Sequence, residues 1–187
     1  MEEKPKTTLI LFIFFTLGLI PFIFMAMYID DESPSNFLLS LSAFVDDLLL
    51  GQVGITSSSL PMLSKIMANY NALATPIIVM IVYISTMIIG EPSGLPKNTN
   101  FSISHYIKII SSTSLIYFLF LIVTCFIYID LNGHSRLGFF AHNKYTLLIL
   151  YVFILYPCWF ILNYSILVTY TSFTKKFFEG RRAIQEQ

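Results

Sequence analysis

Charged side chains are scarce in this sequence of 187 residues. Asp, Glu, Lys and Arg make up 12% of it, hydrophobic residues make up 56%, and the mean hydropathy is +0.73. A soluble domain carries about 25% charged residues, so this composition is typical of a chain surrounded mostly by lipid. The formal net charge is zero, so the composition provides no basic surface that would favour nucleic acid as a partner.

Ionised side chains are absent from four long apolar runs, at residues 8–28, 72–89, 109–129 and 146–170. Each run has the ~20 residues needed to cross ~30 Å of hydrocarbon. A transporter coupled to protons or ions keeps an ionisable residue in its spans despite a cost of ~2.5–3.5 kcal/mol. The sequence therefore predicts one integral membrane domain over residues 1–187, an all-α bundle of four transmembrane helices, without such coupling.

Side chains that could bind a metal or react are also few. The two cysteines, Cys125 and Cys158, fall at different depths of separate predicted spans, so we expect no disulfide between them. His134 and His142 share a loop but lack a third ligand at zinc spacing. Phosphate-binding glycine loops, HExxH pairs and nucleophile elbows are absent. We therefore expect no enzyme activity, no metal site and no cofactor.

Basic residues are distributed unevenly between the two sides of the predicted bundle. Four spans place both termini on one side, and the positive-inside rule assigns the more basic side to the cytoplasm. Tyrosines at the opposite ends of the spans agree, because an amphipathic ring favours the membrane interface. The side with the termini carries Lys4, Lys6, Lys97, Lys108, Lys175, Lys176, Arg181 and Arg182, the other side carries only Lys65, Arg136 and Lys144, and the tyrosines are Tyr28, Tyr70, Tyr128 and Tyr145.

The loop at residues 30–71 is the longest outside the spans and begins with three acidic residues. Ser35 is placed to cap a following helix, which we expect to end at Gly51. Asp46 and Asp47 lie off its apolar face and form either a contact surface for a partner or an ordinary solvated face. The apolar face predicts an amphipathic helix that lies on the membrane surface. This face consists of Phe37, Leu38, Leu41, Phe44, Val45, Leu48 and Leu49.

Polar residues inside the predicted spans are neutral. Ser85 and Thr86 in the second span lie at the depth of residues 111–114 in the third, so we expect these two spans to pack there. Asn163 is the most polar group deep in the fourth span. We expect it to bond to a neighbouring helix, and the alternative is that it grips a foreign helix. Pro61 is suited to a helix start, and Pro76 is expected to kink or restart that helix.

Several motifs occur in an order that resembles a known family. The order of these motifs along the spans and loops resembles that in immunity proteins against pore-forming colicins. The similar group is the four-span one that protects against colicins A and B. The motifs are Gly18–Pro21, Ile55–Ser57 with Pro61, Met67–Asn71, Gly138–Asn143 followed by Thr146–Tyr151, and the basic tail Lys175–Phe178 with Gly180–Arg182.

The resemblance implies bacteriocin immunity in the bacterial inner membrane of a toxin-producing cell, from a gene on a plasmid. The partners would be membrane lipids and the hydrophobic helices of a pore-forming colicin, held so that the channel stays closed. The alternative is a small non-catalytic subunit of a membrane transporter or channel complex. The sequence does not identify the cognate toxin or show whether the bundle associates with itself. The residues expected to contact the toxin are Asp46, Asp47, Thr56, Ser57, Ser58, Tyr70, His142 and Asn163.

Overall fold

Four helical segments of the chain are long and apolar enough to cross a membrane: Leu9–Tyr28, Pro61–Ser85, Ile103–Thr124 and Lys144–Phe173. The computed structural model describes residues 6–48, 55–89, 103–133 and 136–185. The prediction of four helices long and apolar enough to cross a membrane is confirmed for the described residues. The helices and strands are α1 (Lys6–Tyr28), α2 (Asn36–Leu48), β1 (Ile55–Thr56), α3 (Pro61–Ile89), α4 (Ile103–Leu121), β2 (Ile129–Asp130), α5 (Lys144–Leu150) and α6 (Tyr156–Gln185).

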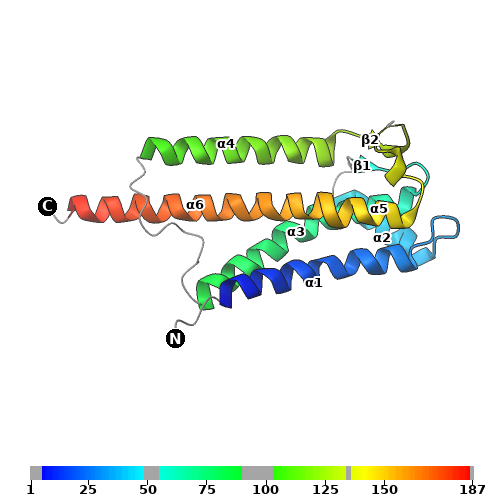
Figure 1. Ribbon diagram of the computed structural model, residues 1–187, viewed down its shortest axis with the longest axis horizontal. Coiled ribbons are helices and arrows are strands. Elements are labelled where there is room, and N and C mark those ends of the chain that lie inside the picture. Colours follow the sequence, from blue (N-terminus) through cyan, green and yellow to red (C-terminus); the bar gives the residue numbers. More distant parts are fainter. Residues whose placement is uncertain (1–5, 49–54, 90–102, 134–135, 186–187) are drawn as a thin grey trace.

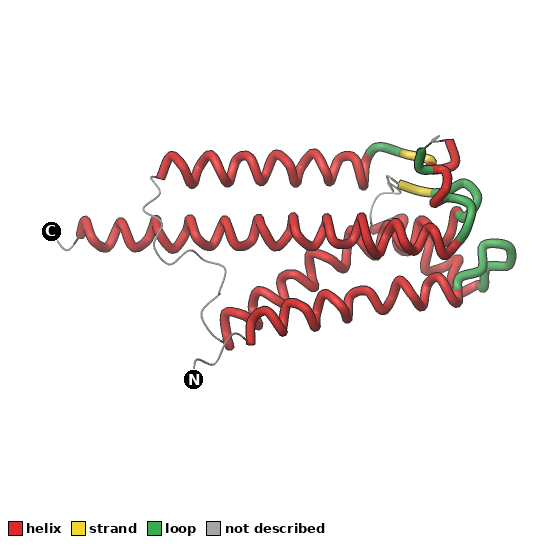
Figure 2. The backbone as a smooth tube through the Cα atoms, in the orientation of Figure 1, coloured by secondary structure: helices red, strands yellow, loops and turns green. Residues whose placement is uncertain are grey.

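The long helices run along one another in a fixed set of pairs. Helix α1 packs on α3, α3 packs on α6, and α4 packs on α6 (Figure 1). The start of α1 and the end of α6 lie at the same end of the bundle, which we call the terminal end. The two strands and most of the described loops gather at the opposite end, which we call the loop end (Figure 2).

Helix α3 is longer than the apolar run of residues 72–89, as the predicted helix start at Pro61 implies. The helix begins at Pro61, as the missing N–H of proline favours, and continues through Pro76 without restarting. Its first turn is capped from a distant loop, because Asp31 Oδ1 accepts hydrogen bonds from the N–H groups of Met62 (2.6 Å) and Leu63 (3.2 Å). A carboxylate at this position also complements the helix dipole.

The fourth span is interrupted by a wide turn. A π-helical turn, Tyr151–Leu155, joins α5 to α6, and Pro157 follows within the first turn of α6. A proline removes one helical hydrogen bond and crowds the preceding turn, and a π turn changes the hydrogen-bond register at that point. A second π turn, Ile122–Phe126, ends the third span at the same end of the bundle.

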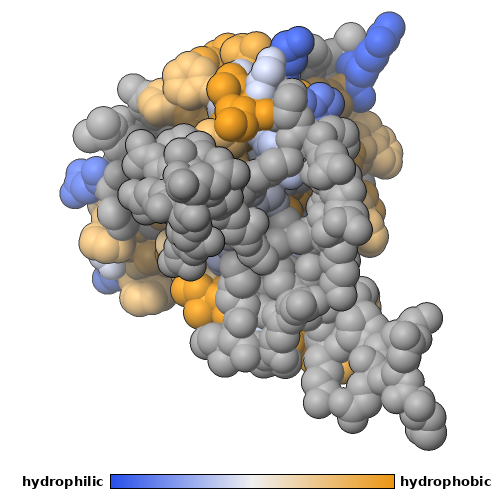
Figure 3. Space-filling view, turned by 90° about the vertical axis from the view of Figure 1, so that its left-hand side faces the viewer, coloured by the Kyte–Doolittle hydropathy of each residue, from blue (hydrophilic) through white to orange (hydrophobic). Residues whose placement is uncertain are grey.

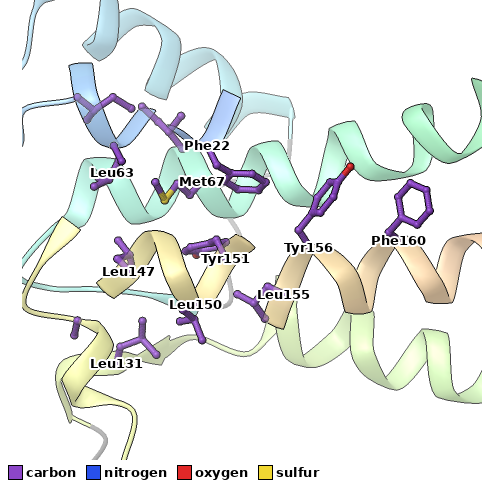
Figure 4. Close-up of a cluster of buried hydrophobic side chains, with 14 of the residues drawn as sticks. Phe22, Leu63, Met67, Leu131, Leu147, Leu150, Tyr151, Leu155, Tyr156 and Phe160 are labelled. Carbon is purple, nitrogen blue, oxygen red and sulfur yellow. The ribbon is translucent and has the colours of Figure 1, made fainter. Parts of the chain in front are cut away.

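The buried core lies toward the loop end and draws on three of the four spans. Phe22 of α1, Met67 of α3 and Tyr151 of the π turn point toward one another (Figure 4). None of the residues of α4 is buried. Exposed large hydrophobic residues occur on all four spans, for example Phe12, Ile77, Phe118 and Ile161. Hydrophobic residues are visible around the described edge of the bundle in the view from the terminal end, as expected of a surface that faces lipid (Figure 3).

The expected packing between the second and third spans is wrong. Helix α4 packs against α6 instead. The rings of Tyr117 and Phe120 contact Trp159 with centroid distances of 5.8 and 5.3 Å. Ser111, Ser112 and Ser114 are exposed on α4. Aromatic contacts therefore replace the hydroxyl contacts that the sequence predicted, and the side chain of Thr86 lies outside the described residues.

Helix α2 begins as predicted, because the Ser35 side chain accepts a hydrogen bond from the N–H of Leu38 at 3.3 Å. Its last described residue is Leu48, and the expected end at Gly51 lies outside the described residues. The predicted apolar face is divided between two surroundings. Leu38 packs against the core, whereas Phe37 and Phe44 are exposed.

Candidate functional site

The two loops at the loop end are joined by a short parallel strand pair. Ile55 of β1 is paired with Ile129 of β2, and Thr56 with Asp130. The strands lie side by side although they belong to different loops (Figure 2). Polar residues follow both strands and meet a residue that precedes α5. We call this group the loop junction, and it consists of Ser57, Ser58, Ser59, Asp130, Asn132 and His142.

Ser57 is the buried centre of the loop junction, with 1% of its surface exposed. Its Oγ lies 2.7 Å from the carbonyl oxygen of Ala141 and 3.0 Å from Oδ1 of Asn132. The hydroxyl has one hydrogen and can donate it to either acceptor. The N–H of Ser57 donates to Ser64 Oγ at 2.9 Å. Ser57 thus ties the first loop to the second loop and to the start of α3.

Asn132 links the buried part of the junction to its exposed surface. Its Oδ1 accepts a hydrogen bond from the N–H of Ser59 at 3.3 Å. Nδ2 donates to Ser59 Oγ and lies 3.3 Å from Nδ1 of His142. Because an amide nitrogen can only donate, Nδ1 of His142 is the acceptor wherever this hydrogen bond forms.

Asp130 holds the ends of both strands in place. Its Oδ1 accepts hydrogen bonds from the N–H groups of Ser58 at 3.0 Å and Asn132 at 3.1 Å. Burial raises the pKa of Asp130, but the hydrogen bonds from Ser58 and Asn132 outweigh it, so the pKa lies below its usual value of 3.8. The carboxylate is therefore ionised at neutral pH, when its acceptor capacity is greatest.

The junction is also fixed to the fourth span. The hydroxyl of Tyr151, in the π turn, lies within hydrogen-bond distance of the carbonyl oxygens of Ile55 (2.9 Å) and Ser64 (3.2 Å). Tyr151 is 1% exposed, so this contact is shielded from solvent. Thr56 follows Ile55 in β1, and its buried Oγ1 has no hydrogen-bond partner among the described residues.

The structure brings together four of the residues that the sequence analysis singled out. Thr56, Ser57 and Ser58 lie in or directly after β1, and His142 reaches the same junction from the second loop. Ser58 and His142 are exposed and could contact a partner, whereas Ser57 is buried. Asp47 is exposed on α2, away from this group, and the side chain of Asp46 lies outside the described residues.

Tyr70 and Asn163 lie within the helical bundle. The Tyr70 ring packs edge-on against Phe22 with a centroid distance of 4.9 Å. Asn163 donates to the carbonyl oxygen of Trp159 at 2.8 Å, one turn back in its own helix. The expectation that Asn163 bonds to a neighbouring helix is therefore wrong. A polar side chain in a membrane helix can be satisfied by the carbonyl of the preceding turn.

Three residues of the junction were missed by sequence reasoning: Ser59, Asp130 and Asn132. Residues 130–133 read Asp-Leu-Asn-Gly, a composition typical of turns, and this was the available signal. No group of three or more His, Cys, Asp or Glu that could hold a metal ion occurs among the described residues. The junction, as described, is a hydrogen-bonded scaffold that presents a few polar side chains.

A family model described as "Colicin immunity protein" matches residues 35–182. The chain belongs to the colicin immunity protein family. Its general function is therefore bacteriocin immunity, and its partner is a colicin. Proteins of this family are non-catalytic inhibitors, which fits a protein that is not an enzyme. No significant match was found among curated proteins or among solved structures.

The match to the immunity family includes both loops of the junction and three of the four candidate spans. Four candidate spans together with this family fit a membrane protein. The alternative of a transporter or channel subunit gains no support from the match.

Proposed function

We propose that this immunity protein lies in the bacterial inner membrane with both termini in the cytoplasm. It binds the membrane-inserted apolar helices of a pore-forming colicin from the side and keeps the channel closed. The family match is the observation that carries the immunity function. The excess of basic residues at the terminal end supports the orientation, and the four apolar spans favour a toxin that acts within the same membrane.

The surface of the bundle suits recognition of another helix in lipid. Association between helices in a membrane depends on close packing, small residues and neutral hydrogen bonds. All four candidate spans expose large apolar side chains, and the four apolar runs of the sequence contain no ionised group. Such a surface can pack against the apolar helices of a toxin without burying a charge.

Helix α4 provides the surface that fits this task best. In its span 6% of the residues are buried, compared with 39% in the spans of α3 and of α5–α6. Ser111, Ser114, Leu115 and Phe118 share one exposed face, since they are spaced as i, i+3, i+4 and i+7. Two small residues beside two large ones provide a shallow recess into which a second helix can pack.

The hydroxyls of Ser111 and Ser114 strengthen this assignment. Thr113, on the neighbouring face, donates to the carbonyl oxygen of Ile109 at 2.8 Å, whereas neither serine makes such a bond within the described residues. A hydroxyl in an apolar environment without a partner costs ~1–3 kcal/mol. A helix packed against this face can accept these hydrogen bonds in place of the carbonyl of the preceding turn. We assign this helix to the toxin, with a second copy of the immunity protein as the alternative to be tested.

The loop junction supports a second part of the proposal, the choice among toxins. Ser58 and His142 are exposed at the loop end, which faces the periplasm in the proposed orientation. Replacing both with alanine should change which colicins are neutralised, without a change in the amount of protein in the membrane. Loss of protection that follows changes in the cytoplasmic loop alone would show that specificity is located elsewhere.

The proposed function is tested by expressing the chain in sensitive cells and challenging them with a panel of colicins. We expect survival with one pore-forming colicin or a few related ones. Protection against none of them, or only against a colicin that does not open channels, would overturn the proposal.

The α4 surface is tested in the same cells with the double variant Ser111→Leu and Ser114→Leu. The added bulk should lower the tolerated toxin concentration by about tenfold or more, which corresponds to ~1.4 kcal/mol of lost binding free energy. The matched control is Thr16→Leu, which adds an apolar side chain at an exposed position of α1. Equal effects of both variants would contradict a specific role for α4, and a change in self-association with unchanged protection would assign the face to a second copy.

A further inference from the structure

Helix α2 presents three different faces, and one of them is not covered by any described residue. Leu38 and Leu41 are half-buried, and Leu38 packs against the core beside α3. Asp47 is exposed on a second, polar face. Phe37 and Phe44 lie two turns apart on a third face, with 71% and 62% of their surfaces exposed. Two exposed phenylalanine rings on one face of a short helix indicate a surface that is covered by something other than water.

The position of α2 along the bundle indicates what covers this face. Helix α2 lies at the loop end, packed on α3 (Figure 1). Only residues 29–35 separate it from Tyr28, an exposed tyrosine at the end of the first span. This connection is fixed to the loop end of the bundle because Asp31 caps the start of α3. Helix α2 therefore lies where the spans leave the hydrocarbon.

We infer that Phe37 and Phe44 insert into the lipid interface at the loop end, so that α2 is an anchor parallel to the membrane surface. Amphipathic helices of this kind bury their apolar face ~5–10 Å into the boundary between headgroups and acyl chains. The occupant is lipid because only residues 29–35 separate α2 from the end of the first span, where the exposed rings of Phe24 and Tyr28 stack with a centroid distance of 6.0 Å. The inference holds for any cognate toxin.

Anchoring of α2 has a consequence for the loops. Helix α2 packs on α3, and the start of α3 accommodates Ser64, which bonds to Ser57 of the loop junction. A lipid contact through Phe37 and Phe44 therefore sets the height of the junction above the membrane. The exposed side chains of the junction are then held at a constant depth relative to a toxin that inserts nearby.

The test places a tryptophan on each face of α2 in the full-length protein. Trp159 is first replaced by phenylalanine, and Phe37→Trp, Phe44→Trp or Ala43→Trp is then added. Ala43 is the matched control, because it is exposed on the polar side of the helix. Each protein is reconstituted without toxin into vesicles of phosphatidylethanolamine and phosphatidylglycerol whose acyl chains carry bromine near the headgroup.

We expect a blue-shifted emission and strong quenching of the tryptophans at positions 37 and 44, and weak quenching at position 43. Equal quenching at all three positions, or no quenching at 37 and 44, would overturn the inference. The second result would mean that the face waits for a protein partner instead.

A second measurement covers the case in which the tryptophan variants misfold. Phe44→Cys and Asp47→Cys are made in a protein whose two cysteines are replaced by alanine, and a membrane-impermeant maleimide is added to the vesicles. Only vesicles with the loop end outward are scored. We expect rapid labelling at position 47 and a several-fold loss of rate at position 44, and equal rates would contradict insertion.

Discussion

The hydroxyl of Tyr70 on α3 donates a hydrogen bond to the backbone carbonyl of Gly18 on α1, across 2.8 Å. A second tyrosine, Tyr156 of α6, donates to the carbonyl of Phe15 at 3.1 Å. Two helices thus attach to the same stretch of α1 backbone, where the absence of a side chain at Gly18 leaves room for them. Tyr70 was expected to contact the toxin, and the structure shows it in an internal contact that positions the first span.

The first prediction concerns the space beside Gly18. A Cβ added there would overlap the Tyr156 hydroxyl and lie 2.9 Å from Cδ1 of Ile78. Gly18→Ala should therefore lower the free energy of unfolding by ~1–3 kcal/mol, as overpacking of a core does. Gly133→Ala is the matched control, because no atom lies within 4 Å of the added carbon. The measurement is unfolding by sodium dodecyl sulfate in detergent micelles, and equal stability of the two variants would contradict the packing described.

The second prediction concerns the Tyr70 hydroxyl alone. Tyr70→Phe keeps the ring against Phe22 but removes the hydrogen bond to Gly18. Hydrogen bonds between membrane helices contribute ~0.6 kcal/mol on average, and we expect a loss of this order in the same unfolding assay. Tyr28→Phe, at an exposed tyrosine, should leave the stability unchanged. A loss as large in the control as in Tyr70→Phe would count against an internal role for Tyr70.

The third prediction tests the centre of the loop junction. Ser57→Ala removes a buried hydroxyl that lies within hydrogen-bond distance of Ala141 and Asn132 and leaves those acceptors without it. A buried polar group that loses its partner costs ~1–3 kcal/mol. We expect this loss in the free energy of unfolding, together with faster proteolysis of the two loops. The comparison is Ser112→Ala on α4, an exposed serine, and equal proteolysis rates for the two variants would be inconsistent with the junction.

The fourth prediction concerns acid. The folded pKa of Asp130 lies below its usual value of 3.8, so the folded state favours the ionised carboxylate. The contribution of Asp130 to the free energy of unfolding is complete above a pH of about 4 and is lost as the pH falls through the folded pKa. Thermal unfolding in micelles should therefore show a steep fall in stability below this pH. Asp130→Asn should flatten the fall, and an unchanged pH profile would refute the role of this carboxylate.

Part of the acid sensitivity should persist in the Asp130→Asn variant. The hydrogen bonds from the Ser33 side chain and the Glu32 backbone, in that order, lower the pKa of Asp30, while burial raises it slightly. Ionised Asp30, in a different turn, therefore also stabilises the folded state, and this stabilisation is also lost in acid. Combining Asp130→Asn with Asp30→Asn should flatten the profile further.

Local sequence signals predicted the elements that depend on local physics. The apolar runs located the four spans, Ser35 marked the start of α2, and Pro61 marked the start of α3. These features depend on neighbouring residues, because capping and helix starts are decided within one turn. The residue that caps α3 was missed because it is Asp31, which is remote in the sequence.

The loop junction could be predicted only in part. Thr56, Ser57, Ser58 and His142 were singled out, but the pairing of Ile55 with Ile129 leaves no trace in a two-residue strand. Periodicity needs four or more residues to be visible, and pairing partners are set by the tertiary fold. The hydrogen bond of Asn163 was predicted wrongly because its partner is also set by the tertiary fold. Hydrogen bonds within the helix and to another helix are equally compatible with the sequence.

The central claim is that the toxin is held by the membrane-embedded surface of the bundle, and photo-crosslinking tests it most directly. A photoreactive amino acid is placed at Ser111 on α4 or, as the control, at Thr16 on α1, and protected cells are challenged with the cognate colicin and illuminated. We expect a crosslink from position 111 to the apolar helices of the channel-forming domain, and little or none from position 16. Cells that remain protected while position 111 gives no crosslink, or crosslinks only to a second copy of the immunity protein, would contradict the account.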